Sequence, residues 1–386
     1  MIKFKELPQH IYIHWPFCKS KCNYCDFISF QKHEGFQKVY HKALLDHIEH
    51  FCDINYTCKV DNEIKTIFFG GGSPSLYPLD LLEKLFSKLK LKFNLGSFQE
   101  ITIEANPFDI THEKLMTWKI LGINRLSLGV QILDDRVLKN LNRIQRIYDI
   151  KKTMQIAPKF FENISVDLIL GLPGNTKEGW KKTLGEVVNW PINHLSVYIL
   201  MVYKNTPLFH KIKNKELNIL QDQDIFDLYK YTINFLKKYS FEQYELSNFA
   251  KSNFVSKHNI AYWNRKPYVG FGLSAASFDG EKRFVNEKNL IKYIDFCSRK
   301  DEFIINYQEF LTEKQRFLEE LMLGLRLNNG VGLHRVLYSL SKDAKKKFLD
   351  GLKVLKSREL INEVGGKIFL TVKGMMLENE VILKLI

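Results

Sequence analysis

The sequence predicts an α/β protein, in which a partial (β/α)6 TIM-type barrel is followed by a small C-terminal helical, winged-helix-like domain. Two observations lead to this fold class. Short apolar, β-rich runs alternate with longer helical stretches through residues 1–240. The chemically unusual residues follow the expected strands, not the helices. Alternating strands and helices imply a parallel sheet with crossover helices, and six such units suit an open or partial barrel.

The expected strands are short and apolar, and they lie at residues 11–14, 66–69, 101–104, 125–130, 164–170 and 194–200. The expected helices have apolar residues at helical spacing, and they lie at residues 38–51, 79–91, 112–121, 134–141, 176–188 and 223–238.

Distinctive loops follow five of these strands. They are CKSKCNYC, GGGSPS, Glu104-Ala105-Asn106-Pro107, Gly129-Val130-Gln131 and Gly171-Leu172-Pro173-Gly174. In a barrel of parallel strands the working residues lie at the carboxyl ends of the strands, on the loops that follow them. We therefore expect one functional site at this end of the sheet.

After about residue 300 the pattern changes. Residues 313–327 form a strongly amphipathic helix pattern, a second helix is expected at 342–356, and Gly365-Gly366 marks a hairpin. Helices followed by such a hairpin are typical of a winged-helix-like module. We therefore expect a barrel in residues 1–240, an extension that completes the barrel in 241–300, and a C-terminal domain in 301–386.

The composition is that of a globular protein, with 386 residues, 45% hydrophobic and 26% charged. The apolar stretches are shorter than the roughly 20 residues of a membrane span, and no secretory signal is recognisable at the N-terminus. We predict a cytoplasmic protein. The net charge of +14 comes from scattered lysines without interleaved aromatics, so no nucleic-acid partner is expected. Nucleic-acid binding by the basic C-terminal module stays as the most distant alternative.

Three of the six cysteines, Cys18, Cys22 and Cys25, lie within eight positions in a C-x3-C-x2-C spacing. A zinc site normally needs four ligands, and the other cysteines form no second CxxC pair. A [4Fe–4S] cluster usually takes four thiolates, so three leave one iron open to a small ligand that carries an amine and a carboxylate. The polar residues between the cysteines argue against three packed core thiols.

This motif, with Tyr24 before its last cysteine, resembles the radical S-adenosylmethionine superfamily. Tyr12-x-His14-x-Pro16-Phe17-Cys18 and Cys25-Asp26-Phe27 resemble the branch of oxygen-independent coproporphyrinogen III oxidases and their relatives. The resemblance implies that S-adenosylmethionine binds the open iron. One-electron reduction of the cluster, by an electron donor, would then cleave the S-adenosylmethionine to a 5′-deoxyadenosyl radical.

Further candidate cofactor-binding residues lie on the strand-end loops. The backbone of Gly71, Gly72 and Ser73 could approach the methionyl end, and Glu104 suits an ammonium group. The resemblance adds Tyr12, Tyr24, Gln131, Arg143 and Asp167 to this site. The family often has a histidine two residues after the arginine, where this chain has Gln145.

Three features distinguish between branches of the family. Phe27 stands where the decarboxylating oxidases usually carry a fourth cysteine, only 17 residues precede Cys18, and His258-Asn259-x-x-Tyr262-Trp263 forms an HNxxYW segment. All three resemble HemW-type haem chaperones, and the resemblance makes His258 a candidate axial haem ligand. From the residues alone, a structural turn in which His258 and Asn259 bond backbone groups is the favoured interpretation, because a lone histidine is not specific for haem. After the sixth strand, residues 203–207 (YKNTP) depart from the family's usual acid.

The leading hypothesis is therefore a radical-SAM-type haem chaperone that binds a [4Fe–4S] cluster, S-adenosylmethionine and haem as cargo, and delivers haem to haem-accepting proteins. The alternative is an oxygen-independent coproporphyrinogen III oxidase that decarboxylates propionate side chains. The sequence predicts an oxidoreductase-like protein without that oxidase activity. Peripheral membrane association and a homodimer both remain open.

Overall fold

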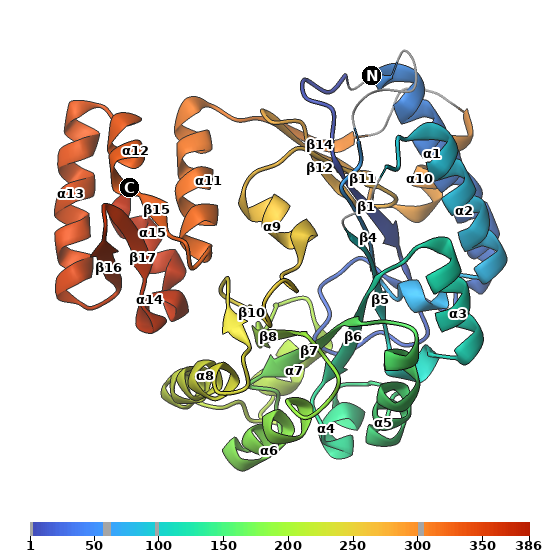
Figure 1. The fold of residues 1–386 in the computed structure, drawn as a ribbon, viewed down its shortest axis with the longest axis horizontal. Coiled ribbons are helices and arrows are strands. Elements are labelled where there is room, and N and C mark those ends of the chain that lie inside the picture. Colours follow the sequence, from blue (N-terminus) through green and yellow to red (C-terminus); the bar gives the residue numbers. More distant parts are fainter. Residues whose placement is uncertain (1–2, 57–62, 97–99, 300–304) are drawn as a thin grey trace.

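The computed structural model describes residues 3–56, 63–96, 100–299 and 305–386. It contains a twelve-stranded sheet and, in the C-terminal part of the chain, a module with its own three-stranded sheet (Figure 1). The large sheet curves around a concave side, and most helices lie on its convex side. No described helix combines the length and the apolar character that crossing a membrane requires.

Six parallel strands form the centre of the large sheet in chain order. They are β1 (His10–Trp15), β4 (Thr66–Gly71), β5 (Glu100–Ala105), β6 (Arg125–Gln131), β7 (Asn163–Leu170) and β8 (His194–Ile199). All six strands expected from the sequence are confirmed, each within two residues at either end.

The two sides of this parallel unit are extended by later segments. On the β1 side follow the parallel strand β11 (Tyr268–Phe271) and then the antiparallel strands β12 (Ala276–Phe278), β13 (Lys282–Asn286) and β14 (Ile305–Phe310). On the β8 side follow β10 (Asn248–Ala250) and β9 (Glu242–Gln243). Within the described residues the strand order has two separate ends, as the predicted partial barrel requires.

The crossover helices are α1 (Gln37–Asn55), α2 (Leu79–Lys92), α3 (His112–Leu121), α4 (Asp135–Asn140), α5 (Ile147–Ile156), α6 (Lys177–Val187), α7 (Pro207–Lys213) and α8 (Asp222–Lys237), and α10 (Leu290–Arg299) packs beside α1. The six helices expected in this region are confirmed, whereas α5 and α7 were not predicted. Side chains set their starts: Thr111 caps α3, and Asp134 caps α4.

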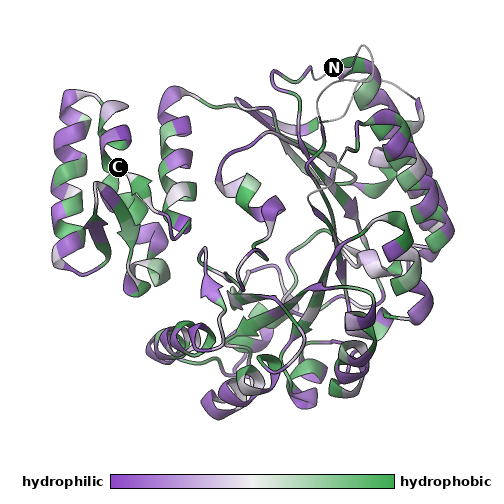
Figure 2. Cartoon of the chain, viewed as in Figure 1, coloured by the Kyte–Doolittle hydropathy of each residue, from purple (hydrophilic) through white to green (hydrophobic). Residues whose placement is uncertain are grey.

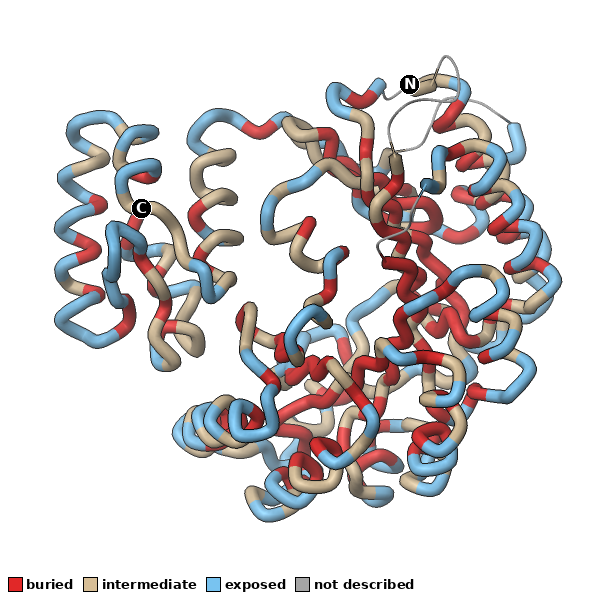
Figure 3. Tube along the Cα trace, viewed as in Figure 1, coloured by how far each residue is buried: buried red, intermediate tan, exposed pale blue. Residues whose placement is uncertain are grey.

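The central strands have one apolar and one polar face because successive side chains point to opposite sides. Toward the helices lie buried residues such as Ile67, Ile103 and Leu126, which belong to one continuous hydrophobic core (Figure 3). The alternating positions are polar and face the concave side. These inward positions include His10, Tyr12, Thr66, Glu100, Thr102, Glu104, Arg125, Ser127, Ser165, Asp167, His194, Ser196 and Tyr198.

The C-terminal module contains α11 (Glu313–Arg326), β15 (Val331–Gly332), α12 (Leu333–Tyr338), α13 (Lys342–Ser357), β16 (Ile361–Val364), β17 (Lys367–Leu370), α14 (Val372–Met376) and α15 (Glu378–Leu385). The expected helices and the hairpin at Gly365-Gly366 are confirmed. Its helices turn apolar stripes inward and polar stripes outward (Figure 2), over a hydrophobic core separate from that of the sheet.

Helix α9 (Lys257–Trp263) lies on the concave side and contacts both β4 and α11 (Figure 1). Just beyond it, Arg265 joins an ion-pair cluster with the C-terminal module. Glu319 of α11 accepts from Arg265 Nε at 3.1 Å and from Arg283 Nε and Nη2 at 2.6 and 2.8 Å. The Arg283–Glu319 pair is bidentate, which makes it the stronger of the two contacts. Glu319 thus links the C-terminal module to β13 through Arg283 and to the segment after α9 through Arg265.

Candidate functional site

The three cysteines share one loop at the carboxyl end of β1. The short strands β2 (Phe17–Cys18) and β3 (Phe30–Gln31) pair in parallel and close the loop at its base. Cys18, Cys22 and Cys25 are free thiols of intermediate burial. They do not converge as a closed ligand set: within the described residues, no three His, Cys, Asp or Glu side chains are grouped to hold a metal ion.

The glycines at the end of β4 let the backbone pass directly beneath this loop. A Cβ atom on Gly72 would lie 2.9 Å from Cys18 Sγ and 2.8 Å from the carbonyl carbon of Pro16. Gly71 has φ +114°, a conformation that favours glycine. Ser73 Oγ donates to Cys18 Sγ at 3.5 Å. The loop is thus supported by groups that can donate to sulfur, which fits a cluster-bearing loop.

Arg143 lies on the other side of the cysteine loop. Its Nη1 donates to Cys22 Sγ at 3.4 Å, and its Nη2 donates to the Gly129 carbonyl at 2.6 Å and to Gln145 Oε1 at 2.8 Å. Burial opposes its charge, but the neighbouring Tyr24 and Cys22 favour it, so the pKa of Arg143 is raised. A fixed cation here suits the negative charge of thiolates bound to iron.

Gln145 fills the position where the family often has a histidine. Its Nε2 donates to the carbonyls of Gly129 at 2.8 Å and Val130 at 3.1 Å, while its Oε1 accepts from Arg143. Gln145 therefore ties the arginine to the end of β6.

Burial raises the pKa of Cys18 and of Cys25. Arg143 near Cys18 and Lys21 near Cys25 act in the opposite direction, but burial outweighs them. A metal removes the protons and accepts the thiolates. The donor set, the Gly72 contact and the Arg143 charge together fit an iron–sulfur cluster, although three ligands alone leave its fourth iron without a protein partner.

The acidic candidates lie on neighbouring inward positions of the sheet. Burial, and next the charge of Asp167, raise the pKa of Glu104 to about 8. Asp167 accepts hydrogen bonds from Ser127 Oγ at 3.0 and 3.2 Å. Tyr12, two strands from Glu104, has its hydroxyl 3.1 Å from His14 Nδ1. All three candidate side chains are half-buried, so they are reached from the concave side.

Gln131 ends β6 at an irregularity in its pairing with β7 and has a left-handed φ of +69°. Its side chain turns back over Gly129. A Cβ on that glycine would lie 3.0 Å from Gln131 Nε2 and 3.1 Å from Arg143 Nη2. The structure therefore brings Gln131 and Arg143 together beside the cysteine loop.

His258 lies elsewhere. It is 1% exposed on α9, at the amino ends of the strands, whereas the cysteines follow their carboxyl ends. Its Nδ1 lies 2.6 Å from Thr66 Oγ1 and its Nε2 lies 2.8 Å from Tyr262 Oη, so both ring nitrogens have partners. Burial lowers the pKa of His258 well below its usual range. Ligation of haem iron by this imidazole would require one of the two hydrogen bonds to break.

Sequence reasoning missed most of the polar concave face. Arg125, His194 and Tyr198 all point inward, and none of the three was named as a site residue. The signal was present as strict alternation of polar and apolar residues in β5, β6 and β8. Asn106, whose Nδ2 donates to Ser73 Oγ at 2.9 Å, also supports the Cys18 loop and was not singled out as a site residue.

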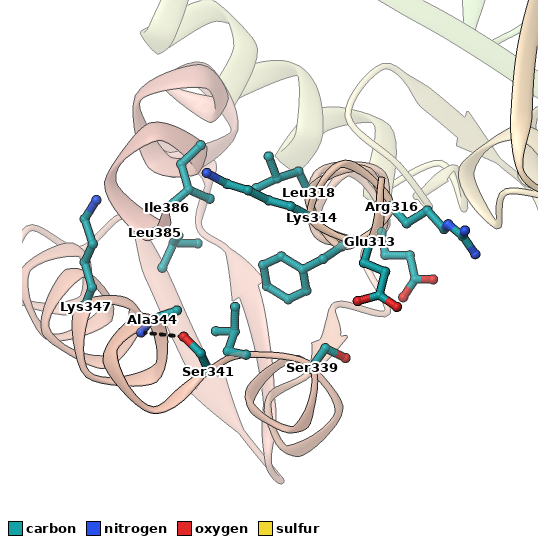
Figure 4. A pocket seen from close by; sticks show the side chains of 13 residues that line it. Glu313, Lys314, Arg316, Leu318, Ser339, Ser341, Ala344, Lys347, Leu385 and Ile386 are labelled. Carbon is teal, nitrogen blue, oxygen red and sulfur yellow. Dashed lines mark hydrogen bonds between the residues drawn. The ribbon is translucent and has the colours of Figure 1, made fainter. Parts of the chain in front are cut away.

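Three hollows lie in or against the C-terminal module, and one of about 490 Å³ separates Lys373 and Met376 of α14 from α8 and the end of β8. A pocket of about 610 Å³ opens between α11, the α12–α13 turn and the end of α15, and none of the predicted site residues lines it (Figure 4). A cleft of about 390 Å³ lies where Trp263 and Arg265 meet α11 and α12. The HNxxYW segment thus reaches this cleft through its tryptophan.

Comparison with known families agrees with this architecture. Residues 12–187 match the model of the radical SAM superfamily, and residues 311–377 match the HemN C-terminal domain. A solved coproporphyrinogen III oxidase (HemN) of Escherichia coli superposes with a TM-score of 0.85 at 23% identity, covering 99% of this chain and 91% of the other. The fold and the cysteine loop therefore define a radical SAM protein, a class that uses a [4Fe–4S] cluster and S-adenosylmethionine.

Two curated relatives indicate which family of radical SAM proteins the chain belongs to. The heme chaperone HemW of Bacillus subtilis is 34% identical over 373 residues, which are 96% of this chain and 97% of that protein. The heme chaperone HemW of Lactococcus lactis is 30% identical over 377 residues, covering 97% and 96%. The chain belongs to the HemW family.

Proposed function

We propose that the protein is a haem chaperone, which binds haem and delivers it to acceptor haemoproteins. The observation that carries this proposal is similarity over nearly the whole chain to proteins named heme chaperone HemW. Phe27 supports it, since this side chain is 69% exposed where the oxidases usually carry a fourth cysteine.

We further propose that Cys18, Cys22 and Cys25 hold the [4Fe–4S] cluster. The open iron would take S-adenosylmethionine, and a reduced cluster would supply the electron that cleaves it. Glu104 and Asp167 would face the amino group, Tyr12 and Tyr24 would pack against the cofactor, and the residues that position it further would be Gly71, Gly72, Ser73, Gln131 and Arg143. If cleavage occurs, an electron donor is a further partner.

The second candidate is radical decarboxylation of coproporphyrinogen III. The half-buried Glu104, Asp167 and Tyr12 favour it, because the concave face keeps polar groups accessible beside the cysteine loop. Nucleic-acid binding by residues 301–386 ranks behind both. A cytoplasmic location, homodimer formation, peripheral membrane association and domain boundaries at residues 240 and 300 stay proposals.

Anaerobic reconstitution followed by a haem titration tests the function. Stoichiometric haem binding, and transfer of the haem to an apo-haemoprotein, should be measured by the Soret band. The same preparation is assayed with reductant and S-adenosylmethionine for carbon dioxide release from coproporphyrinogen III. Carbon dioxide release without haem transfer would favour the oxidase instead.

A further inference from the structure

A row of polar side chains crosses the inner part of the concave face. Arg125 starts β6 and is paired in register with Thr102 of β5 and Asn163 of β7. Directly paired residues of parallel strands point to the same side of a sheet, so the three side chains lie next to one another. Arg125 is 2% exposed and Thr102 is 0% exposed.

Each member of this row has a buried polar atom without a hydrogen-bond partner among the described residues. The atoms are Arg125 Nε, Thr102 Oγ1 and Asn163 Oδ1. Buried polar groups in proteins are nearly always hydrogen-bonded, and a buried, unpaired guanidinium costs several kcal/mol. Three such atoms in register at one place therefore indicate a partner that the chain itself does not provide.

The groups around Arg125 already have other partners. His194 interacts with Ser165 Oγ at 2.7 Å and with Tyr244 Oη at 2.8 Å, through its two ring nitrogens. Both ring nitrogens of His258 are occupied as well. Arg125 acts on both histidines only through its charge. Neither of these two imidazoles is left to accept from the guanidinium.

Exposure on the concave face is greatest on the side of the cysteine loop. Tyr198, an inward residue near the carboxyl end of β8, is 44% exposed, whereas the inward residues at the amino ends are buried, except Asn163, which is half-buried. The amino end is closed by α9, whose backbone N–H groups at Lys257 and His258 donate to Glu100. We use the word cup for this polar concave face, with Tyr198 at its exposed rim and Arg125 at its buried floor.

We propose that Arg125 is an anion-binding residue on the floor of this cup, and that it receives a carboxylate of the porphyrin cargo. This inference rests on the proposed haem binding. Haem carries two propionate carboxylates, and the planar guanidinium suits a carboxylate because both can form two parallel hydrogen bonds. Thr102 Oγ1 beside it can donate a further bond.

Acidic neighbours do not occupy the guanidinium. Asp167 lies closer to the rim and accepts from Ser127 and Ser165. Burial raises the pKa of Glu104 to about 8, so at neutral pH this neighbour is mostly uncharged. Both acids act on Arg125 through charge, but no described carboxylate forms a hydrogen bond or ion pair with its guanidinium. S-adenosylmethionine also carries a carboxylate, so the test must separate the two sources.

The test combines variants of the protein with a variant of the ligand. Haem and its dimethyl ester, in which both propionates are uncharged, are titrated into the reconstituted full chain and into Arg125→Met and Arg125→Lys. Arg136→Met serves as the matched control, since that arginine is 91% exposed. Affinity for S-adenosylmethionine is measured on the same samples, and thermal unfolding and iron content report whether each variant folds.

For Arg125→Met we expect haem to bind about 10- to 100-fold more weakly than to the unaltered chain, while the affinity for the dimethyl ester stays unchanged. Arg125→Lys keeps the positive charge, so it should recover part of the affinity for haem. Its affinity for the ester should equal that of the unaltered chain. Equal losses for haem and ester in both variants would overturn the proposal, as would weakened S-adenosylmethionine binding with unchanged haem binding. If the unaltered chain binds neither porphyrin, the proposed function itself fails.

Discussion

Arg143 donates a hydrogen bond to Cys22 Sγ over 3.4 Å, although the two residues are 121 positions apart in the sequence. The same guanidinium is fixed by the Gly129 carbonyl and by Gln145. A thiol of the cysteine loop is therefore placed against a cation anchored on the end of β6. This contact connects the cysteine motif to the sheet.

Replacing Arg143 should make the proposed cluster harder to reduce. Reduction adds negative charge, and removing a nearby cation and its hydrogen bond to sulfur disfavours that charge. For Arg143→Met we expect the midpoint potential to fall by on the order of 50 mV, close to a tenfold change for one electron. An EPR redox titration measures it, with Arg136→Met as the control. An unchanged potential in a fully loaded variant would contradict the proposed role.

Cys22→Ala should abolish the cluster. With one of three ligands missing, two thiolates remain, and the iron and sulfide content after anaerobic reconstitution should fall to background. The control is Cys297→Ser, because Cys297 is a half-buried cysteine on α10, outside the loop. If Cys22→Ala keeps the EPR signal of a reduced cluster, the assignment of the three ligands is wrong.

His258→Ala should destabilise the protein. The change removes two buried hydrogen bonds, to Thr66 and Tyr262, and leaves the Tyr262 hydroxyl without its partner, while Thr66 keeps its bond to His10. We expect a loss of roughly 2–4 kcal/mol in the free energy of unfolding, measured by urea denaturation of the chain without haem. His258→Gln, which can keep one of these bonds, should lose less.

A haem titration of the same two variants distinguishes a structural role of His258 from a role as a ligand of the haem iron. If His258 serves the fold only, the folded His258→Gln variant keeps the Soret maximum and the affinity of the unaltered chain. A shifted Soret maximum in that variant would instead support axial ligation, with one of the two hydrogen bonds exchanged for iron.

Acid should destabilise the fold below about pH 6.5. Burial lowers the pKa of His10 to about 4 and of His47 to about 3, and those of His194 and His258 well below the usual value. Between pH 6.5 and 4 the unfolded chain therefore binds protons at these histidines that the native chain does not. The free energy of unfolding thus decreases as the pH is lowered through this range. Glu104, Asp167, Glu245 and Glu378 have raised pKa values and act in the opposite direction, but they are outnumbered once His14 and His41, whose pKa values are lowered to about 4, are added to the four histidines.

Urea denaturation at pH 7.5, 6.0 and 5.0 measures this effect. Each histidine contributes at most about 1.4 kcal/mol per pH unit over its range. His47→Gln should reduce the slope by that amount, because it removes one titrating group. A stability that rises on acidification would contradict the burial of neutral imidazoles.

Glu319→Gln should loosen the C-terminal module. Glu319 is the acceptor for both Arg265 and Arg283, and removing its charge takes the charged partner from Arg283 and leaves Arg265 paired with Glu320 alone. We expect a loss of about 1–3 kcal/mol and faster proteolysis between β14 and α11. Limited proteolysis reads this directly. Glu313→Gln, at the exposed start of α11, should behave like the unaltered chain.

Much of the fold was predictable because local patterns determine it. The six central strands and the helices at residues 313–327 and 342–356 follow from apolar periodicity and were expected within a few residues. Helix α5 was missed, since no oxygen-bearing Ser, Thr, Asn or Asp precedes Ile147 as a start signal. Residue Arg146 stands at that position instead.

The sequence by itself determined the cysteine loop, the glycines beneath it and the alternation that makes one face of the sheet polar, because each depends on spacing within one segment. Only the tertiary structure decided that Arg143 reaches Cys22, that His258 lies at the end of the strands opposite the cysteines, and that Arg125 is buried without a partner. Those relationships depend on strand register and on the curvature of the sheet, which no single segment encodes.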